Sequence, residues 1–272
     1  MKPAPFDYAS VGSVPETVDY LTQSHGTAKP VAGNQSLGPM LNLRLVRTGA
    51  LIDVSMLPEL RRSEERNDSV FLGAAITHAE IEDGEVPDPT NGWIRDAAAH
   101  IAYRAVRNKG TIGGSLAHAD PAADWVIVLT GLCASVLIGD TSSPRRVLME
   151  DFITGPFTTT LKDGELLLGV DIPKPSPDAK WGYWKFSRQV GEFAKASACV
   201  LIDPQKNHTR CAVGALGGKP LVLENPEALI NGTLKPSEAL QTALPNRRID
   251  ELALHIAALE RALLKSRGKD VL

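Results

Sequence analysis

The sequence has few cysteines, and this scarcity excludes two classes of protein. There are three among 272 residues, Cys133, Cys199 and Cys211, all widely separated and in apolar surroundings, and there is no C-x-x-C pair. A disulfide framework needs an even set of cysteines, and an iron–sulfur cluster needs a full set of thiolates. We therefore expect reduced core cysteines, and we expect any iron–sulfur cluster that works with this chain to be bound by another chain.

Long apolar runs and an excess of one charge are missing as well. No run approaches the roughly 20 apolar residues that span a bilayer, and the start, MKPAPFDYAS, lacks the apolar centre of a signal peptide. The net charge is -3 at pH 7, without the clustered Lys and Arg that mark a nucleic-acid-binding face. The sequence predicts a soluble, cytoplasmic protein with no membrane span and no nucleic-acid partner.

Helical and strand patterns alternate along the chain, which is long enough for two or three packed units. Ser13 is expected to cap a helix that carries Pro15 in its first turn, and Thr77 with Glu80 has the form of a capping box. Strands are expected at 30–33, 51–54, 70–76, 134–139, 145–149, 166–172, 181–188, 194–202 and 210–216. Further helices are expected at 93–105, at 121–134 after a cap at Asp120, and at 249–264.

Two short segments rich in glycine and hydroxyl residues stand out, 32-AGNQS-36 and 111-TIGGS-115. Each can offer consecutive backbone N–H groups and a side-chain hydroxyl to an anion. Asn34 tolerates a positive φ better than most residues, so the first turn keeps this ability. Two such turns that face each other suit a pyrophosphate, although Gly-Gly-Ser is also ordinary loop chemistry. Neither segment has the ending of a Walker A loop or the spaced glycines of a Rossmann fingerprint.

The two segments, in this order and about 80 residues apart, carry a resemblance to a known family. The stretches 29–54 and 106–134, the second with its H-x-D-P-x-x-D, resemble the flavin-binding medium subunits of the molybdenum hydroxylases. That family includes the medium subunit of carbon monoxide dehydrogenase and the flavin domain of xanthine dehydrogenase. Residues 72–82 and 181–200 are similar to later blocks of the same family.

The resemblance implies an α+β fold, the two-subdomain FAD-binding fold of the molybdenum hydroxylase medium subunit (PCMH/vanillyl-alcohol-oxidase-like) plus a small C-terminal α+β domain. The proline-rich link 173–180 agrees with a boundary near residue 175. We expect an N-terminal FAD-binding subdomain at 1–57, a middle FAD-binding subdomain at 58–175, and a C-terminal domain at 176–272 with a three-stranded antiparallel sheet and helices.

The resemblance also implies where FAD binds. FAD would lie extended between the first two subdomains, with its pyrophosphate held by 32–36 and 111–115. Asp124 matches the family's adenosine-side contact, Leu167 matches a position that packs on the flavin, and Lys185 matches one that reaches the isoalloxazine edge. The implied FAD-binding residues are Lys29, Pro30, Val31, Ala32, Gly33, Asn34, Gln35, Ser36, Ile101, Thr111, Ile112, Gly113, Gly114, Ser115, Asp120, Asp124, Leu167, Lys185 and Phe193.

Two of these positions have consequences for redox chemistry. A positive charge at Lys185 favours a flavin that becomes anionic on reduction, whereas the alternative is an exposed lysine on an edge strand. Phe193 stands where the family commonly has Tyr or Trp. Phenylalanine can stack on a ring face but cannot donate a hydrogen bond, so the family pattern does not define the redox potential or the oxygen access of this chain.

Two other kinds of site can be considered for the same residues. The segment 113-GGSLA-117 lacks the last glycine of the G-x-S-x-G nucleophile elbow, which argues against a hydrolase built on Ser115. His118, Asp120 and Asp124 could ligate a metal, but helix capping accounts for Asp120 and an FAD contact accounts for Asp124. We expect no catalytic residue and no metal ligand on this chain.

The resemblance implies a subunit that works within a complex. A large subunit would hold the molybdenum cofactor, a small subunit would hold two [2Fe-2S] clusters, and this chain would pass electrons through FAD to an outside acceptor such as a quinone, NAD or oxygen. A dimer of heterotrimers is the expected assembly. The alternatives are a stand-alone flavoprotein oxidase or reductase, and a non-enzymatic scaffold subunit that has lost FAD.

Overall fold

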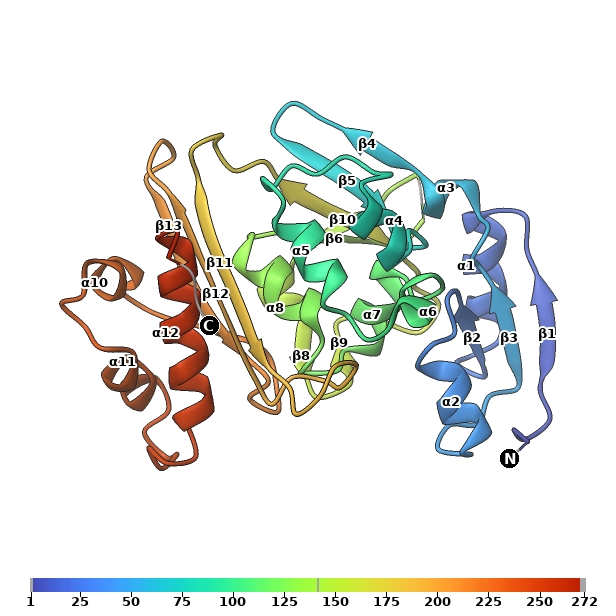
Figure 1. Ribbon diagram of the computed structural model, residues 1–272. Helices are drawn as coiled ribbons and strands as arrows, with labels where there is room; N and C mark the ends of the chain where they lie inside the picture. The colour runs from blue at the N-terminus through green and yellow to red at the C-terminus, as the bar shows by residue number, and fades with distance from the viewer. Residues whose placement is uncertain (1, 141, 270–272) are drawn as a thin grey trace.

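The computed structural model describes residues 2–140 and 142–269, and they form three consecutive parts that lie in a row (Figure 1). Each part contains its own main sheet, and the three sheets follow one another in the sequence without exchanging strands. One apolar core runs through the first two parts and reaches the C-terminal sheet, a second core lies inside the third part, and a small third cluster lies in the N-terminal part.

The N-terminal part is a small sheet of parallel strands with a helix on the link between each successive pair. The sheet has the order β1-β3-β2, and β3 pairs in parallel with both neighbours. Ser13 caps α1 and accepts a hydrogen bond from the N–H of Glu16, which confirms the predicted helix start. The elements are β1 (Asp7–Ser10), α1 (Val14–Gln23), β2 (Ala28–Val31), α2 (Leu37–Asn42) and β3 (Ala50–Asp53).

The middle part is a five-stranded sheet of order β4-β5-β10-β6-β7, in which β10 lies between β5 and β6 and is antiparallel to both. Thr77 and Glu80 form the predicted capping box at the start of α4. The elements are α3 (Pro58–Arg61), β4 (Ser63–Glu65), β5 (Ser69–Gly73), α4 (His78–Asp83), α5 (Trp93–Ala99), α6 (Arg104–Arg107), α7 (Ile112–His118), α8 (Asp124–Gly131), β6 (Ser135–Ile138), β7 (Arg145–Leu148), α9 (Met149–Phe152), β8 (Ile153–Gly155), β9 (Thr158–Thr159) and β10 (Leu167–Pro173).

The C-terminal part is an antiparallel sheet with helix α12 on its outer face (Figure 1). Side chains alternate between the faces of β11, so Trp181 stacks on Trp93 of α5 while Trp184 turns the other way, toward Arg261 of α12. The elements are β11 (Lys180–Phe186), β12 (Ala196–Asp203), β13 (His208–Gly214), β14 (Leu221–Val222), α10 (Pro226–Asn231), α11 (Pro236–Ala243) and α12 (Ala253–Ser266).

Several local expectations were wrong. The C-terminal sheet has four strands, because the short β14 pairs with β13. The helix expected from residue 121 begins at Asp124, since the Asp120 carboxylate accepts a hydrogen bond from the N–H of Ala122 in a turn instead of capping the helix. The segment 111–115, expected as a turn, opens helix α7.

Candidate functional site

The first glycine segment forms a loop with unused hydrogen-bond donors. It leaves the carboxyl end of β2 and leads into α2, and Asn34 adopts the left-handed conformation with φ 57°. The backbone N–H groups of residues 33 to 36 have no hydrogen-bond partner within the part of the chain that the structure describes. The four donors lie just before a helix N-terminus, where the helix dipole also favours negative charge. This loop can therefore bind an anion.

The second glycine segment is different, because most of its backbone donors are already used. The N–H groups of Ile112 and Gly113 donate to Ile76 O (3.0 Å) and Ala74 O (2.9 Å), and those of Gly114 and Ser115 donate to Thr111 Oγ1 and Thr111 O (both 3.0 Å). Gly113 is needed for packing, since a Cβ there would lie 2.4 Å from the Cβ of Ala74. Among the described residues, only the Thr111 N–H and the Ser115 hydroxyl of this segment remain without a partner. The expectation of a second row of free amides was wrong.

The two segments nevertheless lie side by side, as the sequence predicted. A Cβ on Gly33 would lie 1.9 Å from the carbonyl oxygen of Lys109 and 2.7 Å from the Cα of Gly110. Only glycine allows this approach of one backbone to another. The free donors at 33 to 36 therefore lie next to the start of the second segment, and together they form one cradle.

A buried histidine, His78, packs against the segment that Gly33 contacts. His78 lies against Gly110, whose Cβ would come within 3.0 Å of the imidazole, and Trp125 Nε1 donates to His78 Nδ1 at 3.0 Å. That bond places the proton of the neutral ring on Nε2. Burial, with a smaller effect from Arg107, lowers the pKa of His78 to about 4, so the ring is neutral at pH 7.

Asp124 and Lys185 form a buried ion pair. Lys185 Nζ lies 2.7 Å from Asp124 Oδ1, and the two side chains are only 10% and 8% exposed. The Tyr183 hydroxyl donates a short hydrogen bond to the same oxygen, and burial followed by the negative charge of Asp124 raises the pKa of Tyr183 well above its usual value. An extended FAD has its adenosine and isoalloxazine at opposite ends. Placing Asp124 at one end and Lys185 at the other was therefore wrong.

Of the remaining expected residues, Ile101 lies near this ion pair, and the others are described by their element and exposure. Lys185 also donates to His100 O at 2.7 Å, which brings the turn that contains Ile101 to the same place. Phe193 is 53% exposed on the loop between β11 and β12. Leu167 is buried on β10, beside Leu168, whose carbonyl accepts from the N–H of Ala74. In β2, Lys29 and Pro30 are exposed and Val31 is buried.

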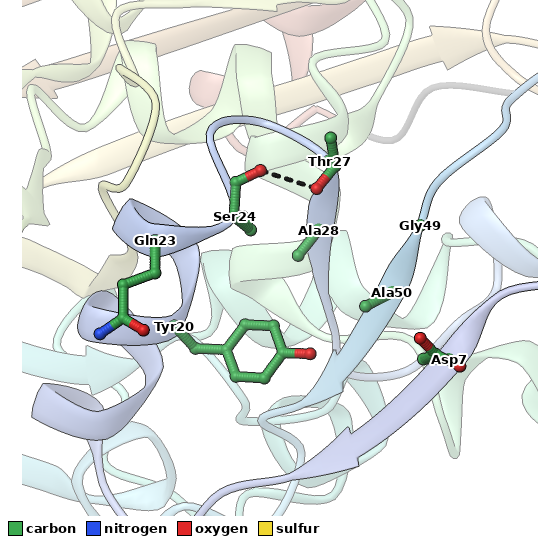
Figure 2. Close-up of a pocket in the computed structure, with 8 residues that line it drawn as sticks. All are labelled: Asp7, Tyr20, Gln23, Ser24, Thr27, Ala28, Gly49 and Ala50. Carbon is green, nitrogen blue, oxygen red and sulfur yellow. Dashed lines mark hydrogen bonds between the residues drawn. The ribbon is translucent and has the colours of Figure 1, made fainter.

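A separate hollow of about 360 Å³ lies at the opposite end of the N-terminal sheet. Figure 2 shows Tyr20 and Gln23 of α1 beside the first residues of the three strands, Asp7, Ala28 and Ala50. Ligands of open α/β sheets bind beyond the carboxyl ends of the strands, and the cradle at 33 to 36 lies there, whereas the hollow lies at the amino ends. We therefore do not assign the hollow to a cofactor.

The hydrolase and metal interpretations find no support in this geometry. No cluster of three His, Cys, Asp or Glu that could hold a metal occurs within residues 2–140 and 142–269. His118 packs against Phe157 with ring centroids 5.2 Å apart, and Asp120 binds the N–H of Ala122. Ser115 has no hydrogen bond to a histidine in the described part of the chain, so it lacks a base that could activate it.

The donors of the cradle fit the diphosphate of a dinucleotide. The loop offers adjacent backbone N–H groups without acceptors, and only glycine allows it to lie so close to the neighbouring segment. Such donors suit an extended anion better than a metal ion, because a metal ion needs oxygen, nitrogen or sulfur ligands. The fold and the cradle thus define an α+β protein that binds a dinucleotide.

Comparison with known proteins gives the particular family. Residues 4–175 match the model of the FAD binding domain in molybdopterin dehydrogenase. The chain is 35% identical to the nicotine 6-hydroxylase medium subunit of Paenarthrobacter nicotinovorans over 88% of this chain and 85% of that protein. It is 33% identical to the 6-hydroxypseudooxynicotine dehydrogenase complex subunit alpha of the same organism, over 89% of this chain and 84% of that protein.

A solved structure agrees over the whole length. A chain of carbon monoxide dehydrogenase from Hydrogenophaga pseudoflava, in a form that lacks the Mo-pyranopterin moiety of the molybdenum cofactor, superposes with a TM-score of 0.85 at 27% identity, covering 100% of both chains. The protein belongs to the family of FAD-binding domains in molybdopterin dehydrogenases, and it is an FAD-dependent oxidoreductase subunit. Within the described residues, no helix is both long enough and apolar enough to cross a membrane.

The sequence did not single out several residues that shape this site. Tyr183 of β11 donates a hydrogen bond to Asp124 of α8, and His78 packs against Gly110. Arg107 and Glu82 join helices α6 and α4. Of these residues, only Arg107 could have been noticed in the sequence, because it lies just before the second glycine segment. Its partner Glu82 is 25 residues earlier, and no sequence pattern connects the two.

Proposed function

We propose that this chain is the FAD-binding electron-transfer subunit of a heterotrimeric molybdenum-dependent hydroxylase or dehydrogenase. A large partner holds the molybdenum cofactor, a small partner holds the [2Fe-2S] clusters, and the complex assembles in the cytoplasm as a dimer of heterotrimers. FAD, when bound, supplies the redox chemistry that links the clusters to an external acceptor. The observation that supports this most is the cradle of free N–H groups at 33 to 36 beside Lys109 and Gly110.

The residues of this chain bind and orient, and they do not act on an organic substrate. Residues 33 to 36, with the Thr111 N–H and the Ser115 hydroxyl, would hold the diphosphate. Lys185 and Ile101 remain our candidates for contacts farther along the cofactor, and Phe193 for a ring contact. The cysteines agree with clusters on another chain, since Cys199 and Cys211 are fully buried and all three thiols are free.

Purification of the protein from its native source tests the proposal. We expect a yellow complex with a flavin absorption spectrum that contains this chain, one larger chain and one smaller chain. A yellow protein that is isolated alone would favour a stand-alone flavoprotein. A colourless chain that does not bind added FAD would favour a scaffold subunit and would contradict the proposal.

A further inference from the structure

The turn after α5, residues 100 to 103, is held by cations that bind its carbonyl groups. It leads from α5 to α6, and Ala102 adopts a left-handed conformation with φ 43°, which is unfavourable for alanine. Lys185 Nζ donates to the carbonyl of His100 at 2.7 Å. Arg107 Nη1 donates to the carbonyls of Ile101 at 2.9 Å and Ala102 at 3.3 Å. The contacts of Arg107 thus fall on the strained part of the turn.

Arg107 is itself fixed by a carboxylate from another helix. Its Nε donates to Glu82 Oε2 at 2.8 Å and its Nη2 donates to Glu82 Oε1 at 2.9 Å, which is the bidentate geometry that a planar guanidinium favours. The Arg107 side chain is only 11% exposed. The hydrogen bond from Arg107 is also the main reason that the pKa of Glu82 is lowered. One edge of the guanidinium therefore binds α4, and Nη1 binds the turn.

Arg107 also stands between two segments that are expected to touch FAD. On one side it holds the turn that contains Ile101. On the other side the chain continues through Asn108 to Lys109 and Gly110, which lie against Gly33. A lysine in place of Arg107 would keep the charge but could not bind Glu82 bidentately and reach both carbonyls together.

We propose that Arg107, oriented by Glu82, is a positioning residue of the FAD site: it fixes the 100–103 turn and the entry to the second glycine segment so that both meet the cofactor in the correct geometry. This inference rests on the proposed function, because it takes FAD to be the ligand of the cradle.

The test uses the full chain freed of FAD, with Arg107→Lys, Glu82→Gln and the control Arg104→Gln. Arg104 binds the same Glu82 carboxylate at 2.8 Å, but its side chain is 47% exposed and it contacts no carbonyl of the turn among the described residues. We expect Arg107→Lys to weaken FAD binding about tenfold or more in a fluorescence titration, a loss of about 1.4 kcal/mol, and Arg104→Gln to change it less than twofold.

Amide hydrogen exchange in the FAD-free protein provides the second measurement. The N–H groups of His100 and Ile101 bond to Ala97 and Ala98. We expect their exchange to become faster in Arg107→Lys and Glu82→Gln, and to stay unchanged in Arg104→Gln. If Arg107→Lys shows the same exchange rates at these amides as the wild type, or the same FAD affinity, the inference is overturned. If the wild-type chain does not bind FAD at all, the proposed function fails, and the exchange data still decide whether Arg107 orders the turn.

Discussion

At Gly33 the backbone of the first loop passes so close to Lys109 that no side chain fits between them. The residue thus joins two segments that are far apart in the sequence. The same contact keeps the loop that carries the free donors of residues 33 to 36 against Gly110, the residue before Thr111. At the scale of single residues, this one contact shapes the anion site that we propose.

Replacing Gly33 with alanine should push the two segments apart. The new Cβ would overlap the Lys109 carbonyl, and overpacking of this kind costs about 1–3 kcal/mol. We expect FAD affinity, measured by flavin fluorescence, to fall about tenfold or more. Gly218→Ala is the matched control, because a Cβ at Gly218 meets nothing within 4 Å. Equal affinity in the two variants would show that the contact does not shape the site.

Breaking the buried pair of Asp124 and Lys185 should destabilise the contact between the middle and C-terminal parts. Asp124→Asn leaves the Lys185 charge buried without an opposite charge, although its hydrogen bond to His100 O remains, and such a loss typically costs about 3–5 kcal/mol. Urea unfolding of the FAD-free protein measures this loss, and adding Lys185→Met should recover part of it. The exposed pair of Arg248 and Asp250 is the control, and Asp250→Asn should cost less than about 1 kcal/mol. A cost at Asp124 as small as that of the control would contradict the buried-pair interpretation.

His78 should make stability depend on pH. Its pKa of about 4 in the folded protein lies below the unfolded value of 6.5, so the unfolded chain binds a proton more readily between these values. Its contribution to stability is complete above pH 6.5 and falls by about 1.4 kcal/mol per unit as the pH drops toward 4. Urea unfolding of wild type and His78→Gln from pH 7 to 4.5 should show the smaller slope in the variant. Equal slopes would mean that His78 is not the group that titrates.

At the scale of elements, the sequence predicted best where the signal was local. Ser13 and Thr77 cap their helices through residues three positions ahead, and both helix starts were correct. The segment 111–115 was misread, because its glycines suggested a turn. Thr111 caps a helix there, and Gly113 lets that helix lie against Ala74. That contact joins distant parts of the chain, so no local pattern reveals it.

Substitution of Gly113 should therefore lower the stability of the folded protein, because the added side chain would overpack the contact with Ala74. Gly113→Ala would place a methyl group 2.4 Å from Ala74, and we expect a loss of about 1–3 kcal/mol in the free energy of unfolding from overpacking. The double variant Gly113→Ala with Ala74→Gly should regain part of this loss, because it removes the opposing methyl group. Thermal or urea unfolding of the FAD-free chain provides the measurement. A single variant as stable as wild type would mean that α7 does not depend on this contact.

At the scale of the whole molecule, the family and its fold were predictable from the order and spacing of two glycine segments, and the family match and the superposed structure confirm them. The ion pair between a residue of the middle part and a residue of the C-terminal part was not predictable from the sequence. Lys185 and Asp124 are far apart in the sequence, and their contact depends on how the C-terminal sheet packs on α8. The sequence predicted two segments that each present consecutive backbone N–H groups, whereas the structure has one loop of free donors that lies against the second segment.

The central claim is that backbone donors at residues 33 to 36 hold a diphosphate. Titration of the FAD-free chain with FAD, followed by competition with ADP and with adenosine, tests it directly, since ADP and adenosine differ only in the diphosphate. Two charge-assisted hydrogen bonds of about 1.5 kcal/mol each correspond to a factor of about 100, so ADP should displace FAD at about 100-fold lower concentration than adenosine. Equal displacement by the two competitors, or no binding of FAD, would contradict the claim.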